Sequence, residues 1–228
     1  MDETKQGYDE NFIEKLEQEN LDTIDGDLEH VKQEVNRYYE ELTISKITGP
    51  CPYDHKEGDN FKLTCMCSDS LCGSMYQEIH PALTTLHYGG GLPWGDDPLS
   101  FKGTCPEGKV HVKGRRIEQP KPCFVRTKTK TIDMTGKGFP GVDEYRINLE
   151  VISVANKCEW GHCEGKKNEL DIFNIGEVCG FMYWEIYHFI NLLISGGSLA
   201  WEADPNIIHG VCPDAFNQVT YRLIREKR

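Results

Sequence analysis

Two stretches of this chain place hydrophobic residues at the spacing of an amphipathic helix, and they predict helices over residues 74–87 and 181–194. The apolar positions are Met75, Ile79, Leu83 and Leu86 in the first stretch, and Met182, Ile186, Ile190 and Leu193 in the second. A pair of glycines follows each stretch, and glycine favours the left-handed conformation in which many helices stop. The pattern therefore predicts two helices of similar length and similar ends.

Alternating apolar and polar positions predict β-strands around these helices. Strands are expected over residues 41–47 and 146–154, ahead of each helix, and over 218–224 behind the second one. A further alternation over 123–132 lies between the helices, in a stretch rich in Gly, Pro and Thr. Two long helices among several short strands predict the α+β class.

The amino-terminal residues 1–43 have a different pattern. Leu28, Val31, Val35, Tyr38 and Leu42 form a narrow apolar stripe in a mostly charged stretch. We expect an acidic helical appendage, which is either a solvated helix docked by one face or a helix through which the chain associates with itself.

The two helical regions belong to an internal repeat. When the chain is shifted by 107 residues, positions 51–106 align with 158–213 without a gap, and 21 of the 56 pairs are identical. Such self-similarity predicts a tandem duplication. The expected domains are the appendage (1–43), repeat 1 (44–114), a basic linker or hairpin (115–145) and repeat 2 (146–228).

The charge of the chain indicates which partners to expect, and its first residues indicate the compartment. The formal net charge is −12, and residues 1–43 alone hold fourteen acids and four bases. This balance repels nucleic acid and anionic membranes, so we expect neither as a partner. The opening "MDETKQGYDE" has no apolar core typical of a secretory signal, which predicts a reducing cytoplasm. There, ten cysteines are expected to be metal ligands, reactive thiols or buried residues rather than disulfides.

Three cysteines and one histidine recur in both copies and are candidate metal ligands. They are Cys51, His55, Cys72 and Cys105 in the first copy, and Cys158, His162, Cys179 and Cys212 in the second. Three thiolates and an imidazole suit tetrahedral zinc, and the same set could hold iron. Zinc is slightly favoured, although no CxxC pair is present. A metal-binding protein with one Cys₃His site per copy is the first hypothesis.

Two other hypotheses remain open. In the first copy His55, Lys56, Asp59 and Cys72 are candidate catalytic residues, because a thiol beside a histidine and a carboxylate supports acid–base or thiolate chemistry. The chain would then be an enzyme with a small-molecule substrate, in which the other copy could complete the site. In the third hypothesis the cysteines are buried structural residues of an interaction module.

The loop "GGGLPWGDDP" after the first helix resembles a phosphate-binding loop only in its glycines. A phosphate loop needs glycines before a helix, and these follow one. A helix stop with a buried Trp94 is the expected structure, and a small pocket beside this tryptophan is the alternative.

Each copy resembles a group of short prokaryotic proteins of unassigned function, usually with one copy per chain. The family pattern combines Cys-Pro-x-Gly-His-Lys-x-Gly-Asp, Gly-Gly-x-Phe/Leu-Pro-Trp and Cys-Pro-Asp. The first copy matches at "CPYDHKEGDNF", "YGGGLPW" and "TCPEG", and the second at "CEWGH", "SGGSLAW" and "VCPDAFNQV". The second copy lacks the Lys and Asp that follow the histidine. The resemblance implies that two single-copy units pair, so that this chain is a fused pseudo-dimer.

Overall fold

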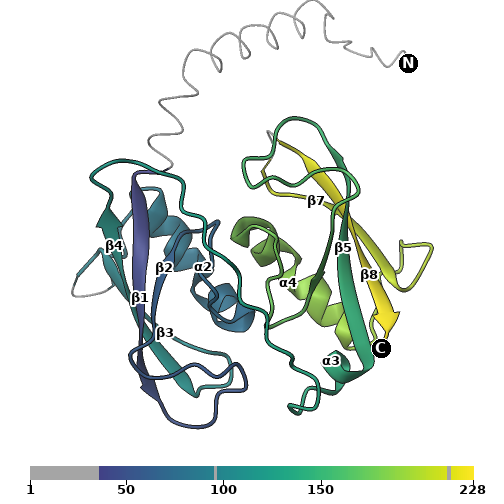
Figure 1. The fold of residues 1–228 in the computed structure, drawn as a ribbon, viewed down its shortest axis with the longest axis horizontal. Helices are drawn as coiled ribbons and strands as arrows, with labels where there is room; N and C mark the ends of the chain where they lie inside the picture. The colour runs from purple at the N-terminus through teal and green to yellow at the C-terminus, as the bar shows by residue number, and fades with distance from the viewer. Residues whose placement is uncertain (1–35, 95–96, 215–216) are drawn as a thin grey trace, which may run out of the picture.

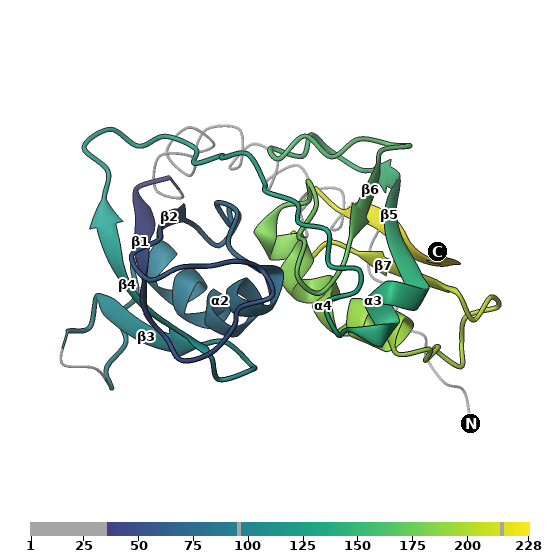
Figure 2. The ribbon, with the colours of Figure 1, turned by 60° about the horizontal axis from the view of Figure 1, so that its bottom comes forward.

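The computed structural model describes residues 36–94, 97–214 and 217–228. It is a mixed α+β structure with two four-stranded antiparallel sheets and three helices. The sheets lie on the outside, and the two long helices lie between them (Figure 1). Turning the molecule keeps this order of sheet, helix, helix and sheet (Figure 2). The predicted class is therefore confirmed.

The N-terminal half (residues 36–118) contains one sheet and one helix. Its elements are β1 (Tyr38–Ile47), β2 (Asn60–Leu63), α2 (Gly73–His87), β3 (Ser100–Thr104) and β4 (Val110–Glu118), and its strand order is β2-β1-β4-β3. The register of β1 against β4 shifts between Ile44 and Lys46. This shift marks a bulge in the strand that leads into the Cys51 turn.

The C-terminal half (residues 145–228) has the same architecture. Its elements are β5 (Tyr145–Val154), β6 (Lys167–Leu170), α4 (Gly180–Ile194), β7 (Ile207–Val211) and β8 (Val219–Lys227), in the order β6-β5-β8-β7. Every element except β8 begins 107 residues after its counterpart. The bulge also recurs, between Val151 and Ser153. The chain thus contains two similar subdomains.

Both helices form where the hydrophobic spacing predicts them. All eight predicted apolar positions are buried, and they pack against the inner face of their own sheet. Gly89 and Gly196 follow the helices with φ of 82° and 80°, as expected for a left-handed helix stop. These parts of the sequence prediction are confirmed.

The two helices meet through reciprocal contacts near their first turns. The Gly73 N–H donates to the Phe173 carbonyl over 2.6 Å, and the Gly180 N–H donates to the Met66 carbonyl over 2.7 Å. A Cβ atom on Gly73 would collide with the Tyr183 hydroxyl, and one on Gly180 with the Tyr76 hydroxyl. The glycines are therefore required by the close approach of the halves.

The connecting segment (residues 119–144) contains α3 (Pro140–Glu144) and otherwise irregular chain that passes along both halves (Figure 2). Ser70 of the N-terminal half binds the backbone of Lys128 and Lys130. Asn174 of the C-terminal half binds both backbone polar groups of Ile132. The segment is therefore fastened to both halves, and the described chain contains no hairpin there.

Two predicted boundaries are wrong where the structure describes them. Tyr38 and Leu42 were expected in the amino-terminal helix, but they lie in β1. Residues 115–118 were assigned to the linker, but they form the end of β4. The rest of the predicted appendage, including Leu28, Val31 and Val35, lies outside the described residues. Self-association through that helix stays a prediction.

The prediction that Trp94 is buried is also wrong. The side chain of Trp94 is 80% exposed, and its counterpart Trp201 is 78% exposed. The turns around them are stabilised instead by Asp97 and Asp204, whose carboxylates accept backbone N–H groups of Leu99 and Asn206.

Among the described helices, none is both long and apolar enough to cross a membrane.

Candidate functional site

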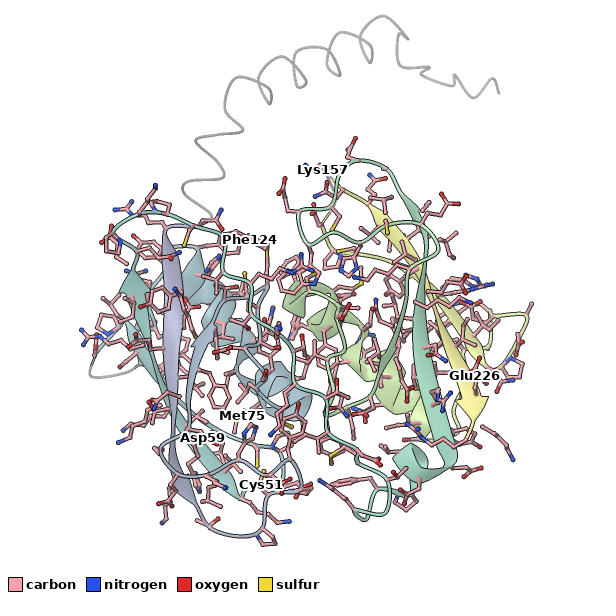
Figure 3. All side chains as sticks on the ribbon, in the orientation of Figure 1. Cys51, Asp59, Met75, Phe124, Lys157 and Glu226 are labelled. Carbon is pink, nitrogen blue, oxygen red and sulfur yellow. The ribbon has the colours of Figure 1, made fainter. Side chains whose placement is uncertain are left out.

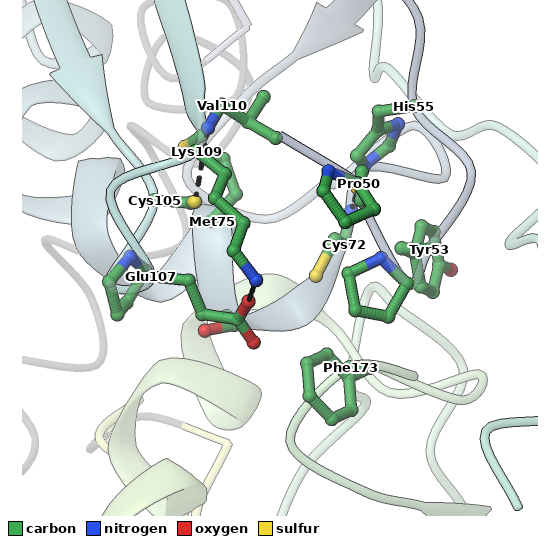
Figure 4. Close-up of a pocket in the computed structure, with 14 residues that line it drawn as sticks. Pro50, Tyr53, His55, Cys72, Met75, Cys105, Glu107, Lys109, Val110 and Phe173 are labelled. Atoms are coloured by element: carbon green, nitrogen blue, oxygen red, sulfur yellow. Dashed lines mark hydrogen bonds and ion pairs between the residues drawn. The ribbon is translucent and has the colours of Figure 1, made fainter. Parts of the chain in front are cut away.

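The four candidate ligands of the N-terminal half meet at one pocket. Cys51, His55, Cys72 and Cys105 all line a cavity of about 30 Å³ at the start of α2. Figure 4 shows the sulfur atoms of Cys72 and Cys105 within this pocket, with Met75 between them. The cavity can hold an ion or one or two water molecules, which makes it much smaller than typical small-molecule pockets.

The pocket is also lined by the other half. Phe173, which belongs to the loop between β6 and α4, contributes its ring to the wall (Figure 4). The Phe173 carbonyl accepts the Gly73 N–H directly after Cys72. The site is therefore composite, and Phe173 could not be predicted from the sequence because it lies 101 positions away from Cys72.

His55 holds the peptide of Cys72. Its Nε2 accepts the Cys72 N–H over 3.2 Å, and its Nδ1 lies 4.0 Å from a carboxylate oxygen of Asp59. Burial lowers the pKa of His55 to about 4, although the charge of Asp59 opposes the shift. The imidazole is therefore neutral at pH 7, with its proton on Nδ1.

Two of the three pocket thiols, those of Cys72 and Cys105, lie next to backbone N–H groups. Cys72 is the N-cap of α2, and burial raises its pKa to about 12 in spite of the N–H groups of Ser74 and Met75. Cys105 Sγ accepts the Val110 N–H over 3.3 Å. A buried thiol with a raised pKa is a weak nucleophile, because thiolate is the reactive form.

The C-terminal half repeats this arrangement. His162 Nε2 accepts the Cys179 N–H over 3.4 Å, and Cys179 Sγ accepts the Met182 N–H over 3.4 Å. Burial raises the pKa of Cys179, and the neighbouring Cys212 and Cys158 raise it further. The same burial raises the pKa of Cys212 to about 11. The four repeated positions thus have similar surroundings in both halves.

The two sites extend in opposite directions from the contact between the halves, because Cys72 and Cys179 directly precede the contacting glycines. Figure 3 places Cys51 at one end and Lys157, the residue before Cys158, at the other. The halves therefore supply two separate sites rather than one shared centre.

The candidate catalytic residues are only partly assembled. His55 contacts Cys72 on one side and Asp59 on the other. Asp59 also accepts the Lys56 N–H over 2.8 Å, and this bond stabilises the turn. Lys56 is exposed and lines none of the described pockets. Its ammonium group is therefore not part of the described site.

The unrepeated cysteines occupy other places. Cys65 and Cys67 are buried in the loop before α2, whereas Cys123 and Cys163 are exposed. Among the residues that the structure describes, no group of three or more His, Cys, Asp or Glu side chains has the arrangement of a formed metal site. The thiols of each pocket would have to move together to coordinate an ion.

Comparison of the chain with protein-family models, with curated proteins and with solved structures finds no match. The resemblance of each copy to short single-copy proteins therefore stays a prediction.

Proposed function

We propose that the chain is a metal-binding protein with one thiol-rich site in each half, and that zinc is favoured over iron. The observation that carries the proposal is the common pocket of Cys51, Cys72 and Cys105 beside His55. Thiolates bind zinc well, and coordination removes the thiol proton that burial otherwise retains.

The histidine has a separate role in this proposal. Because His55 Nε2 accepts the Cys72 N–H, the imidazole fixes the peptide that carries one ligand. Ligation through Nε2 would require that hydrogen bond to break. The three cysteines of each half are therefore the first ligands in this proposal. His55 and His162 position a cysteine peptide, and either histidine would complete a Cys₃His set through Nδ1 or after that hydrogen bond breaks.

Pocket size favours metal binding over catalysis, and the raised pKa of the thiol opposes both roles unless a bound cation displaces the proton. A space of about 30 Å³ fits an ion but is too small for most organic substrates. A neutral histidine cannot stabilise a thiolate as an ion pair, and the raised pKa of Cys72 leaves the thiol protonated at pH 7. The alternative of an enzyme with a cysteine nucleophile receives less support from this site.

We also infer that the two halves arose by duplication and pair as a fused pseudo-dimer. The reciprocal bonds Gly73 to Phe173 and Gly180 to Met66 support this, because each residue and its partner exchange roles after a shift of 107 positions. Such self-complementary contacts are typical of twofold interfaces. Each thiol site then depends on the opposite half for part of its wall.

Elemental analysis of the full chain, purified without a tag and without oxygen, tests the proposal. We expect about two metal ions per chain, and about one in Cys51→Ser or Cys158→Ser. Cys123→Ser is the matched control, because Cys123 is exposed and unrepeated. The control should retain both ions. A folded protein that takes up no zinc after incubation with excess zinc would contradict the proposal.

Proton release gives a second readout. Because burial holds the proton on Cys72, zinc binding must displace it, so the apparent affinity should rise with pH between pH 6 and 8. Zinc titration with a pH indicator in weak buffer measures the released protons. Binding without proton release would show that the buried thiols are not ligands.

A further inference from the structure

The two equivalent histidines differ in one contact. In the N-terminal half the Asp59 carboxylate lies 4.0 Å from His55 Nδ1. The position equivalent to Asp59 in the C-terminal half is occupied by Lys166. His162 Nδ1 is buried and has no hydrogen-bond partner among the residues that the structure describes. A shift of 107 residues thus replaces a nearby carboxylate by a lysine.

The unpartnered atom is a donor. His162 Nε2 accepts the Cys179 N–H, so the proton of the neutral ring is on Nδ1. The side chain is more than nine-tenths buried, with 4% of the residue exposed. A buried N–H without an acceptor destabilises the folded state, so an acceptor that arrives from outside would be favoured. Lys166 occupies the position in the C-terminal half that Asp59 occupies beside His55.

Two cations lie in the neighbourhood of His162. The charges of Lys166 and Arg126 both act on the His162 ring, and both disfavour its protonated form. Arg126 comes from the connecting segment, and its guanidinium lies 4.8 Å from the centre of the Trp160 ring. Next to it is a cavity of about 330 Å³, lined by Arg126, Thr127, Lys128, Thr129, Trp160 and Glu177.

One carboxylate lies among these cations. Glu177 is 3.7 Å from the Lys166 ammonium, but its side chain is 76% exposed. An exposed ion pair of this length contributes little and is readily exchanged for another anion. Arg126, Lys128 and Lys166 therefore leave this corner positively charged in a chain of net charge −12.

We propose that the C-terminal half binds a small oxyanion, such as phosphate or the phosphate group of a small ligand, between Lys166, Arg126 and His162. The anion supplies the negative charge that Asp59 provides near His55 in the N-terminal half. Arg and Lys suit an oxyanion because they combine charge with several donors. The cavity beside them leaves room for more than the anion itself. The N-terminal half, with Asp59 in place, has no such site.

Lys166→Asp is the decisive variant, because it gives the C-terminal half the residue that the N-terminal half has. We expect phosphate binding by the full chain, measured by isothermal titration calorimetry, to weaken at least tenfold in this variant. Arg126→Gln should weaken it by a similar factor. Lys113→Asp is the matched control, since Lys113 is an exposed residue of β4 in the other half. This control should bind as tightly as the unchanged protein.

The ¹⁵N signal of His162 Nδ1 provides a readout that general charge effects do not move. It should shift on addition of phosphate, while the signal of His55 stays in place. Tighter binding of phenyl phosphate than of phosphate would support a phosphorylated ligand, and equal binding would support the free anion. Equal weakening in Lys166→Asp and Lys113→Asp, or no binding of either probe at 10 mM, would overturn the proposal.

Discussion

The two halves share strand order, helix bounds and bulge, but they differ in the chemistry of their interiors. Four buried positions of the N-terminal half carry Glu40, Cys65, His80 and His87, and their counterparts are Ile147, Ile172, Tyr187 and Ile194. The same topology therefore forms over both polar and apolar interiors. The glycine contacts and the hydrophobic helix faces are common to both halves, and they are sufficient to define the fold.

Glu40 is the most unfavourable of these polar residues. Its side chain is fully buried, and neither carboxylate oxygen has a hydrogen-bond partner within the part of the chain that the structure describes. Its cross-strand neighbour Arg116 donates instead to the carbonyls of Leu86 and Gly90 at the end of α2. Burial raises the pKa of Glu40 to about 8, although the Arg116 charge opposes the shift. The carboxyl group is therefore largely protonated at pH 7.

The largest predicted effect is the pH dependence that Glu40 imposes. The folded state holds this proton more tightly than the unfolded state, whose pKa is about 4.5. Stability is therefore greatest below pH 4.5 with respect to this group, and it falls as the pH rises toward 8. The full shift corresponds to about 5 kcal/mol. Urea unfolding at pH 5 and pH 8.5 measures the loss.

Glu40→Gln and Glu40→Ile should remove most of that pH dependence. The second variant installs the residue of the other half, so it should also raise the free energy of unfolding at pH 8.5 by about 2–5 kcal/mol. Glu41→Gln on the same strand is the control, because Glu41 is exposed. An unchanged slope in both Glu40 variants would show that other groups cause the pH dependence.

The reciprocal glycines predict a smaller and symmetric effect. Gly73→Ala and Gly180→Ala each force a methyl group against a tyrosine hydroxyl of the opposite half. Each should lower the free energy of unfolding by about 1–3 kcal/mol. Because Tyr76 and Tyr183 make the same bond to equivalent carbonyls, the two costs should be similar. Chemical denaturation compares them directly.

The double variant Gly180→Ala with Tyr76→Phe distinguishes the steric cost of the contact between the halves from the effect of alanine on the helix itself. Removing the hydroxyl takes away the nearest clashing atom, although two ring carbons remain 2.5 and 2.7 Å from the Cβ position. The two changes together should therefore cost less than the sum of each alone. Strictly additive costs, or a cost at only one glycine, would show that the halves do not approach each other equivalently.

The sequence predicts the positions of the two long helices, but it predicts only part of the strands and of the candidate site. Helix positions followed from the spacing of Met75, Ile79 and their counterparts, because that period is specific to helices. Tyr38 and Leu42 were misassigned because residues four apart share a face in a helix and in a strand alike. The short strands β2 and β3 have too few alternating positions to be recognised. Phe173 reaches the pocket only through pairing of the halves, which spacing cannot reveal.

The exposed tryptophans give the smallest predicted effect on stability. Trp94 and Trp201 occupy equivalent positions, so the sequence suggested a shared place in the interior. The structure shows instead that both indoles face solvent, while Trp160 is buried. Packing therefore does not account for the repeated tryptophan. Trp94→Ala and Trp201→Ala should each change the free energy of unfolding by no more than about 0.5 kcal/mol.

Acrylamide quenching of fluorescence sharpens this prediction. The double variant Trp94→Phe, Trp201→Phe should lose most of the readily quenched emission, because the remaining Trp160 is buried and the remaining Trp184 is half-buried. Trp160→Phe is the matched control and should keep that emission. A cost above about 1 kcal/mol for either alanine variant would mean that its indole is covered in the full chain. The repeated tryptophan would then be a packing residue in the half that carries the cost.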